Sequence, residues 1–210
     1  MSYPAEPDFV WYASYGANMC AERLHCYVAG GTPPGGSRAN PGCRNTTLPC
    51  QSRAVWLRGG VYFALASPMW SGGLAMYDPA LPGATPARAY LVTAEQFHDI
   101  AAQEMYRSQR AAAGAVGAVV AAGRQQWGQG RYETVLYAGE LEGRPILTFT
   151  ASWGWDEVEP VAPSAAYLSV IGTGLRQGHV WAPARTAAYL AGRPGAAGVW
   201  SPAAVARLVG

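Results

Sequence analysis

The chain has 210 residues, of which half are hydrophobic and 13% are charged. A chain of this length fits one domain, or one domain with a small appendage, and this composition excludes disordered and highly charged proteins. The net charge of +2 is small and the arginines are scattered along the sequence, so we expect no nucleic-acid partner. All 15 basic residues are arginines, which excludes chemistry that needs a lysine amine, such as Schiff-base catalysis.

The sequence carries no targeting or membrane pattern. Residues 1–8 contain neither a basic segment nor an apolar one, so we expect no secretory signal. No apolar run reaches roughly 18 residues, the length that spans a bilayer. We therefore expect a cytoplasmic protein without membrane contact. The lack of lysine, together with 26 glycines, is typical of a GC-rich bacterial genome.

The first half of the chain predicts short strands and one helix. The aromatic run Phe9–Tyr15 predicts a buried strand that breaks at Gly16. Asn18 is then the candidate N-cap of a helix that runs to about Ala29. The Gly- and Pro-rich stretch 30–51 is long for a structureless connection, and we expect it to form a partial lid. Further strands are expected over 54–57, 61–66, 73–77 and 87–93.

The second half adds helices. Thr93 is the candidate N-cap of a helix over Ala94–Gln103, and Gln96 stands where a capping box needs it. The stretch 111–122 fits either a helix or a strand of small residues. Strands are expected over 131–138 and 145–150, and helices after Ser164, over 184–191 and over 202–208. Strict alternation of strands and helices is missing, so the predicted class is α+β with a mostly antiparallel or barrel-like sheet.

The metal-binding residue types form no recognisable site. The candidates are Cys20, Cys26, Cys43, Cys50, His25, His98 and His179. No cysteine pair has the spacing of a zinc knuckle, and the histidines are isolated from one another. We expect reduced thiols, with a Cys43–Cys50 disulfide as the alternative. Neither a metal nor another cofactor is expected.

The turn after the first strand has a possible chemical use. Gly16 permits a tight turn between Tyr15 and Asn18, after which the backbone N–H groups of a helix start point outward. Such donors suit a carboxylate or a developing oxyanion. The alternative is an ordinary strand-to-helix turn capped by Asn18.

Three segments carry a resemblance to a known family. Residues 10–19, Val-Trp-Tyr-Ala-Ser-Tyr-Gly-Ala-Asn-Met, resemble the Tyr-Gly-Ser-Asn loop of the gamma-glutamylcyclotransferase-like superfamily. Residues 88–104 are similar to that family's strand and helix, which end in a catalytic glutamate, here Glu104. Residues 163–167, Pro-Ser-Ala-Ala-Tyr, followed by Gly174, resemble a third family motif. Together the matches cover the chain to about residue 180.

A more specific resemblance is to actinobacterial proteins that are often labelled histone deacetylase. The isolated histidines give that label no support, because a zinc deacetylase needs a cluster of histidine and aspartate ligands. Two positions depart from the family pattern. Ala17 replaces the serine of the loop, and Met105 follows the glutamate where glycine is frequent.

The resemblance implies a gamma-glutamylcyclotransferase-like fold, a small mixed or antiparallel β-barrel with flanking helices. We expect this domain over residues 1–182 and a C-terminal helical extension packed on it over 183–210. The implied acid/base is Glu104. The candidate binding residues are Tyr15, Gly16, Ala17, Asn18, Met19, Arg44, Ser164 and Tyr167.

Some of these candidates have a second interpretation. Arg44 and Arg88 are candidate partners of a substrate carboxylate, with surface roles as the alternative. Ser164 is either a substrate contact or the N-cap of the helix that follows it. Glu133 is a second candidate carboxylate, for which we favour a position in solvent.

The implied reaction is internal aminolysis. The α-amine of a gamma-glutamyl group attacks its side-chain amide carbon, which releases an amine and 5-oxoproline. One carboxylate suffices to move the proton between the two amines, and burial raises its pKa toward neutrality. We expect a small-molecule substrate of specialised metabolism and a monomer or homodimer. The competing hypotheses are an amide hydrolase or acyltransferase with the same pocket, and a non-catalytic small-molecule binding protein of the same fold.

Overall fold

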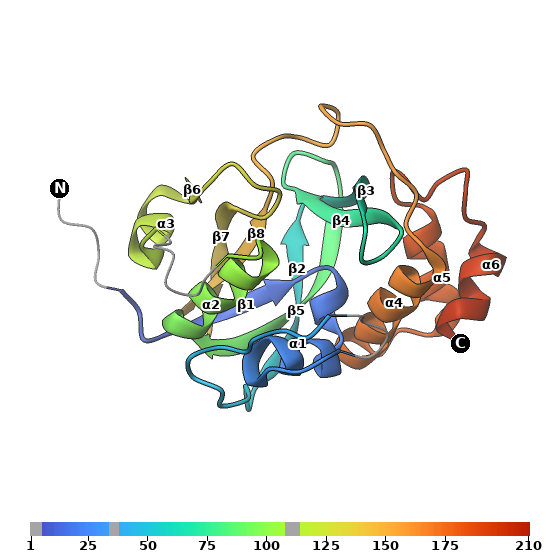
Figure 1. Ribbon diagram of the computed structural model, residues 1–210. Coiled ribbons are helices and arrows are strands. Elements are labelled where there is room, and N and C mark those ends of the chain that lie inside the picture. Colours follow the sequence, from blue (N-terminus) through green and yellow to red (C-terminus); the bar gives the residue numbers. More distant parts are fainter. Residues whose placement is uncertain (1–5, 34–37, 108–113) are drawn as a thin grey trace.

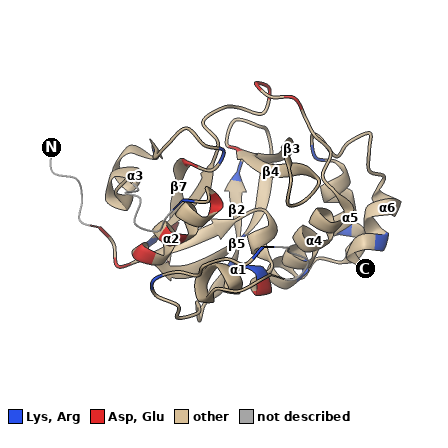
Figure 2. Ribbon diagram, in the orientation of Figure 1, with Lys and Arg blue, Asp and Glu red and all other residues tan. Residues whose placement is uncertain are grey.

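The computed structural model describes residues 6–33, 38–107 and 114–210. The fold is α+β: a mixed sheet crosses the molecule, α4, α5 and α6 gather at one end, and α3 lies at the other (Figure 1). None of the described helices has the length and apolar character needed to cross a bilayer. The charged residues of the described part of the chain are spread over many elements rather than gathered on one (Figure 2).

The main sheet has the strand order β2-β5-β1-β8-β7-β6. Its strands are β1 (Phe9–Ser14), β2 (Ser52–Arg58), β5 (Ala84–Thr93), β6 (Arg124–Gln126), β7 (Thr134–Leu141) and β8 (Arg144–Thr150). The β1–β8 pair is parallel, and the other neighbours are antiparallel. The α+β class and the mostly antiparallel sheet are therefore confirmed.

The strands do not close into a barrel, which corrects the barrel-like expectation. Over the described part of the chain, β2 and β6 are the two edges of an open sheet. The remaining strands, β3 (Gly60–Ser67) and β4 (Gly72–Asp78), pair with each other as a separate antiparallel hairpin. Because the hairpin does not join the sheet, no strand bridges the two edges.

Strand β1 lies in the middle of the sheet, between β5 and β8. Every residue of β1 after Phe9 is buried. This pattern explains its nearly continuous apolar sequence, since a strand covered on both faces needs no polar alternation. The chain leaves the sheet at Ser14 and turns at once into the 3-10 helix η1 (Ala17–Met19).

The helices are α1 (Ala21–Ala29), α2 (Ala94–Glu104), α3 (Val116–Ala122), α4 (Ala165–His179), α5 (Pro183–Ala191) and α6 (Pro202–Val209). The capping box of Thr93 and Gln96 at the start of α2 is confirmed. The ambiguous stretch forms helix from Val116, while its residues 111–113 lie outside the described residues. All four cysteines are free thiols.

The prediction for Asn18 as an N-cap was wrong. The 3-10 turn comes between the strand and α1, so Cys20 occupies the N-cap position of α1 without a side-chain hydrogen bond. The side chain of Asn18 is thereby free to point toward α2 instead.

Helix α4 packs directly against η1. A Cβ on Gly174 would lie 2.4 Å from the Cβ of Met19 and 2.8 Å from the backbone nitrogen of Cys20, so this approach needs a glycine. The two later helices, α5 and α6, pack on α4 and on each other. A domain boundary at residue 182 stays a prediction.

The stretch 38–51 lies along α2. The Gln96 side-chain amide donates to the carbonyls of Asn45 and Thr47 at 2.9 and 2.8 Å. Arg44 binds Asp99 of the same helix through its backbone N–H and its guanidinium. This long segment is therefore attached to the helix that ends in Glu104.

Candidate active site

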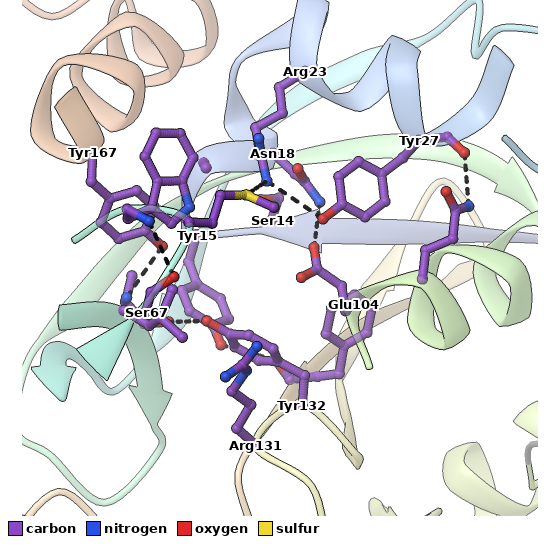
Figure 3. Close-up of a pocket in the computed structure, with 18 of the residues that line it drawn as sticks. Ser14, Tyr15, Asn18, Arg23, Tyr27, Ser67, Glu104, Arg131, Tyr132 and Tyr167 are labelled. Carbon is purple, nitrogen blue, oxygen red and sulfur yellow. Dashed lines mark hydrogen bonds between the residues drawn. The ribbon is translucent and has the colours of Figure 1, made fainter. Parts of the chain in front are cut away.

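A cavity opens where the end of β1, the start of α1 and the end of α2 meet the β3–β4 hairpin, the segment before β7, and β8 (Figure 3). Aromatic residues and charged or polar residues contribute equally to its lining. The charged residues are Arg23, Glu104 and Arg131, and the aromatic ones are Tyr12, Tyr15, Tyr27, Trp70, Tyr106, Tyr132, Phe149 and Tyr167. A cavity lined by both aromatic and polar side chains is typical of small-molecule sites.

The carboxylate of Glu104 is held by Asn18. The Asn18 amide nitrogen donates to Oε1 of Glu104 at 2.8 Å and also lies 3.4 Å from the Tyr12 hydroxyl. Asn18 is itself buried, and its Oδ1 has no partner among the described residues. The turn after β1 and the end of α2 are thus joined by a direct hydrogen bond.

The surroundings of Glu104 act on its pKa in opposite directions. Desolvation at the cavity wall has the largest effect and raises the pKa above the usual value of 4.5. The positive charge of Arg23 and hydrogen bonds from Tyr27 and Asn18 lower it, but the net shift is upward. A carboxyl group with a raised pKa, inside a cavity, is suited to accept and return a proton.

The turn contributes backbone as well as a side chain. Gly16, Ala17 and Asn18 line the cavity. The N–H groups of Ala17 and Asn18 precede the first hydrogen bond of η1, which Met19 N–H donates to the Gly16 carbonyl at 3.1 Å. The carbonyl of Met19 points the other way, where it accepts from the Tyr90 hydroxyl at 2.8 Å. Met19 does not line the cavity.

The tyrosine walls are tied down by their hydroxyls. Tyr15 donates to the Phe149 carbonyl at 2.9 Å, and Tyr132 donates to the Ala75 carbonyl at 3.0 Å. The Tyr167 hydroxyl accepts from the backbone N–H of Ala75 at 3.2 Å. Burial raises the pKa of Tyr167 to about 12, so it stays neutral at physiological pH. These residues shape the cavity rather than supply a reactive group.

Three predicted binding residues do not line the cavity. Arg44 forms ion pairs with Glu95 and Asp99 at 3.1 and 2.9 Å, so it is committed to α2. The hydroxyl of Ser164 accepts from the backbone N–H of Tyr167 at 3.2 Å and caps α4, as its second interpretation predicted. The third is Met19.

Arg88 and Glu133 also lie outside the cavity lining. Arg88 reaches the Met19 carbonyl and Gln177 at 3.2 and 2.9 Å. The expectation of Glu133 in solvent was wrong, because it is buried and paired with Arg107 at 2.7 Å. No described residue between 38 and 51 lines the cavity, so a lid role for this segment stays a prediction.

Sequence reasoning assigned no binding role to the two arginines of the cavity. Arg23 lies on the buried face of α1 beside Leu24, Tyr27 and Val28. A charged residue within an apolar helical stripe is the pattern that could have revealed it. Arg131 precedes the start of β7 and enters the cavity by tertiary packing, which no local pattern predicts.

Comparison with solved structures identifies the fold. A solved structure of a gamma-glutamyl cyclotransferase matches with a TM-score of 0.53 and 15% identity, over 96% of this chain and 98% of that one. The chain has the gamma-glutamyl cyclotransferase fold. An uncharacterized human protein is also similar, at 16% identity and a TM-score of 0.47, over 82% of this chain and 81% of its own.

Matches at the level of sequence are few. No family model matches the chain. A protein of Arabidopsis thaliana named "Histone deacetylase 5" is 28% identical over 190 residues, which is 80% of this chain. The chain spans 28% of that protein's length. The gamma-glutamyl cyclotransferase fold therefore rests on structural likeness, and the position of Glu104 beside the turn after β1 is the feature that leads to a function.

Proposed function

We propose that the protein is a gamma-glutamylcyclotransferase-like enzyme that cleaves a gamma-glutamyl amide by intramolecular aminolysis, with Glu104 as its acid/base. The observation that carries the proposal is the hydrogen bond between Asn18 and Glu104 at the wall of one shared cavity. This hydrogen bond joins a carboxyl group of raised pKa to the turn at Gly16–Asn18, to whose backbone N–H groups we assign the role of donors in the reaction.

The reaction requires one proton carrier. The α-amine nitrogen of the substrate forms a bond to the side-chain amide carbon while Glu104 takes one of its protons. The carbon–nitrogen bond of the amide then breaks, and Glu104 returns that proton to the leaving amine. The N–H groups of Ala17 and Asn18 are the donors we assign to the negative charge that develops on the amide oxygen. The substrate supplies its own nucleophile.

The lining of the cavity supports a small polar substrate in an aromatic enclosure. Tyrosine side chains, among them Tyr15, Tyr132 and Tyr167, share the lining with Glu104, and we expect a bound substrate to displace water from the reacting atoms. Holding an amine within reach of its own amide favours ring closure over hydrolysis, because an intramolecular nucleophile has a high effective concentration.

The name of the Arabidopsis relative leads to no competing proposal. In residues 6–33, 38–107 and 114–210, no three histidine, cysteine, aspartate or glutamate side chains gather into a potential metal site. The match also leaves most of the Arabidopsis protein without a counterpart in this chain. We therefore base the proposed chemistry on Glu104.

The test is release of 5-oxoproline from a panel of gamma-glutamyl amines and gamma-glutamyl amino acids, measured by mass spectrometry. In Glu104→Gln we expect the rate to fall about 100- to 10,000-fold, the usual contribution of an acid/base residue. Glu95→Gln is the matched control, since Glu95 is an exposed carboxylate on the same helix and does not line the cavity. Full activity of Glu104→Gln would remove the assignment.

The products separate cyclisation from hydrolysis and transfer. Glutamate in place of 5-oxoproline would identify an amide hydrolase, and a new gamma-glutamyl amide formed with an added amine would identify an acyltransferase. Binding without turnover across the whole panel would identify a non-catalytic protein of this fold.

A further inference from the structure

Arg23 is a nearly buried cation that the proposed reaction does not use. Its relative exposure is 6%, and its side chain points from α1 into the cavity (Figure 3). One terminal nitrogen, Nη2, lies 3.5 Å from the Tyr27 hydroxyl and 3.9 Å from the Met69 sulfur. The nitrogens Nε and Nη1 have no hydrogen-bond partner in the described part of the chain.

Three other arginines of the chain show what is missing. Arg44 has Asp99, Arg53 has Glu142 and Arg107 has Glu133 as carboxylate partners, at 2.7–3.0 Å. All three are more exposed than Arg23, yet each forms an ion pair. No ion pair holds Arg23 among the described residues, although burying a cation without a partner is unfavourable.

Aromatic rings hold the guanidinium in place without neutralising it. Its carbon lies 5.0 Å from the centre of the Trp70 ring and 5.5 Å from that of Tyr27. Such cation–π contacts fix the orientation of the guanidinium, but they leave its charge in place. Glu104 is the acidic residue in the described lining, and it accepts hydrogen bonds from Asn18 and Tyr27.

We propose that Arg23 is the binding residue for a carboxylate of the small-molecule ligand, and that its missing partner is this ligand. Because the proposal rests on the proposed function for its chemistry, the group is the α-carboxylate of the gamma-glutamyl moiety. A guanidinium binds a carboxylate through two parallel hydrogen bonds, which fixes the orientation of the bound group as well as its charge.

The charge of the whole cavity fits this ligand. Arg23 and Arg131 carry two positive charges, and ionised Glu104 carries one negative charge. The site is therefore cationic by one unit before the ligand enters. The reactive form of a gamma-glutamyl amide has a free α-amine and an ionised α-carboxylate, so it is anionic by one unit. Positive charge nearby also disfavours the protonated amine, which could not attack.

The test compares two small probes of the same ring shape. 5-Oxoproline carries a carboxylate and 2-pyrrolidinone does not, and binding of each is measured by isothermal titration calorimetry. We expect the wild-type protein to bind 5-oxoproline at least about tenfold more tightly than 2-pyrrolidinone. Equal affinities, or no binding of 5-oxoproline, would overturn the proposal without any variant.

Substitutions then assign the effect to one residue. In Arg23→Met we expect 5-oxoproline to bind about 10- to 100-fold more weakly and 2-pyrrolidinone to be unaffected. Arg23→Lys keeps the charge and should retain part of the affinity for 5-oxoproline. This variant provides the test of the proposal if Arg23→Met does not fold. Arg58→Met is the control, since it removes an exposed arginine outside the cavity. Unchanged 5-oxoproline affinity in Arg23→Met and Arg23→Lys would overturn the assignment.

The outcome is separable from that of the proposed function. Arg23-dependent binding of 5-oxoproline in a protein that never releases it from gamma-glutamyl compounds would end the enzymatic proposal and leave this one standing. Turnover that is lost in Glu104→Gln but unchanged in Arg23→Met would end the proposal for Arg23 and leave the enzymatic proposal standing.

Discussion

Asp99 and Glu104 are carboxylates of the same helix, and their surroundings differ in kind. Asp99 is fully buried and accepts hydrogen bonds from the Arg44 backbone and guanidinium. Glu104 accepts from the neutral amide of Asn18, beside a cation that forms no ion pair with it, Arg23. The protein itself supplies the hydrogen-bond partners of Asp99, whereas Glu104 lies in a cavity where a ligand can supply further partners.

The two regions divide their roles between stability and function. Where the stretch 38–51 meets α2, polar groups such as Gln96 and Asp99 bind other parts of the protein and stabilise the fold. At the end of α2, the buried oxygen of Asn18 and two nitrogens of Arg23 lack partners among the described residues. Unmatched buried polar groups cost stability, so we expect substitutions in the two regions to affect different properties.

The largest effect is expected on stability, from Asp99→Ala. The change leaves the part-buried backbone N–H of Arg44 without its acceptor and removes a buried side chain, and we expect the free energy of unfolding to fall by about 2 to 3 kcal/mol, measured by urea denaturation. Glu95→Ala removes the exposed partner of the same arginine and should cost less than about 1 kcal/mol. Equal losses in the two variants would contradict this division of roles. The catalytic rate of folded Asp99→Ala should stay near the wild-type value.

A smaller effect, on activity, is expected from Asn18→Ala. Removal of the amide leaves Glu104 without its closest donor, and we expect kcat/KM to fall about 10- to 100-fold. Because the Asn18 hydrogen bond lowers the pKa of Glu104, the acidic limb of the pH–rate profile should move to higher pH in the variant. A fall in rate with an unmoved profile would indicate that Asn18 acts on the substrate instead.

The smallest effect is a change in how stability depends on pH. The folded protein holds the Glu104 proton more tightly than the unfolded chain, since the pKa is raised in the fold. The stability that this tighter proton binding contributes is fully present below about pH 4.5 and is lost as the pH rises through the raised pKa. Above that pKa the contribution of Glu104 no longer changes. In Glu104→Gln this loss should disappear, so the variant should be at least as stable as the wild type at neutral pH. A lower Tm for the variant at pH 7 would refute this.

The sequence predicted the elements whose causes are local. The aromatic run of β1, the break at Gly16 and the capping box of Thr93 are readable because each depends on neighbouring residues. The resemblance of residues 88–104 directed attention to Glu104. These features sufficed to predict the fold class and one wall of the cavity.

The remaining features depend on contacts between distant segments. The helix-cap prediction for Asn18 was wrong because no local pattern indicates that its amide reaches across to α2. Arg44 could not be excluded from the binding residues by sequence, since its partner Asp99 lies on a distant element. The open sheet was not predicted from the sequence. The alternation of polar and apolar residues along a strand does not show which strand it pairs with, so it could not indicate that β3 and β4 pair separately.

The anchoring of the tyrosine hydroxyls has a thermodynamic consequence for ligand recognition. The hydroxyls of Tyr15, Tyr132 and Tyr167 form hydrogen bonds with backbone groups, so these side chains have few other rotamers to lose when a ligand binds. A cavity with such fixed walls distinguishes ligands by their shape. Its side chains lose little conformational entropy on binding, and they cannot rearrange much to fit a different ligand. Ligands of one chemical series that differ by a single methylene group should therefore differ strongly in affinity.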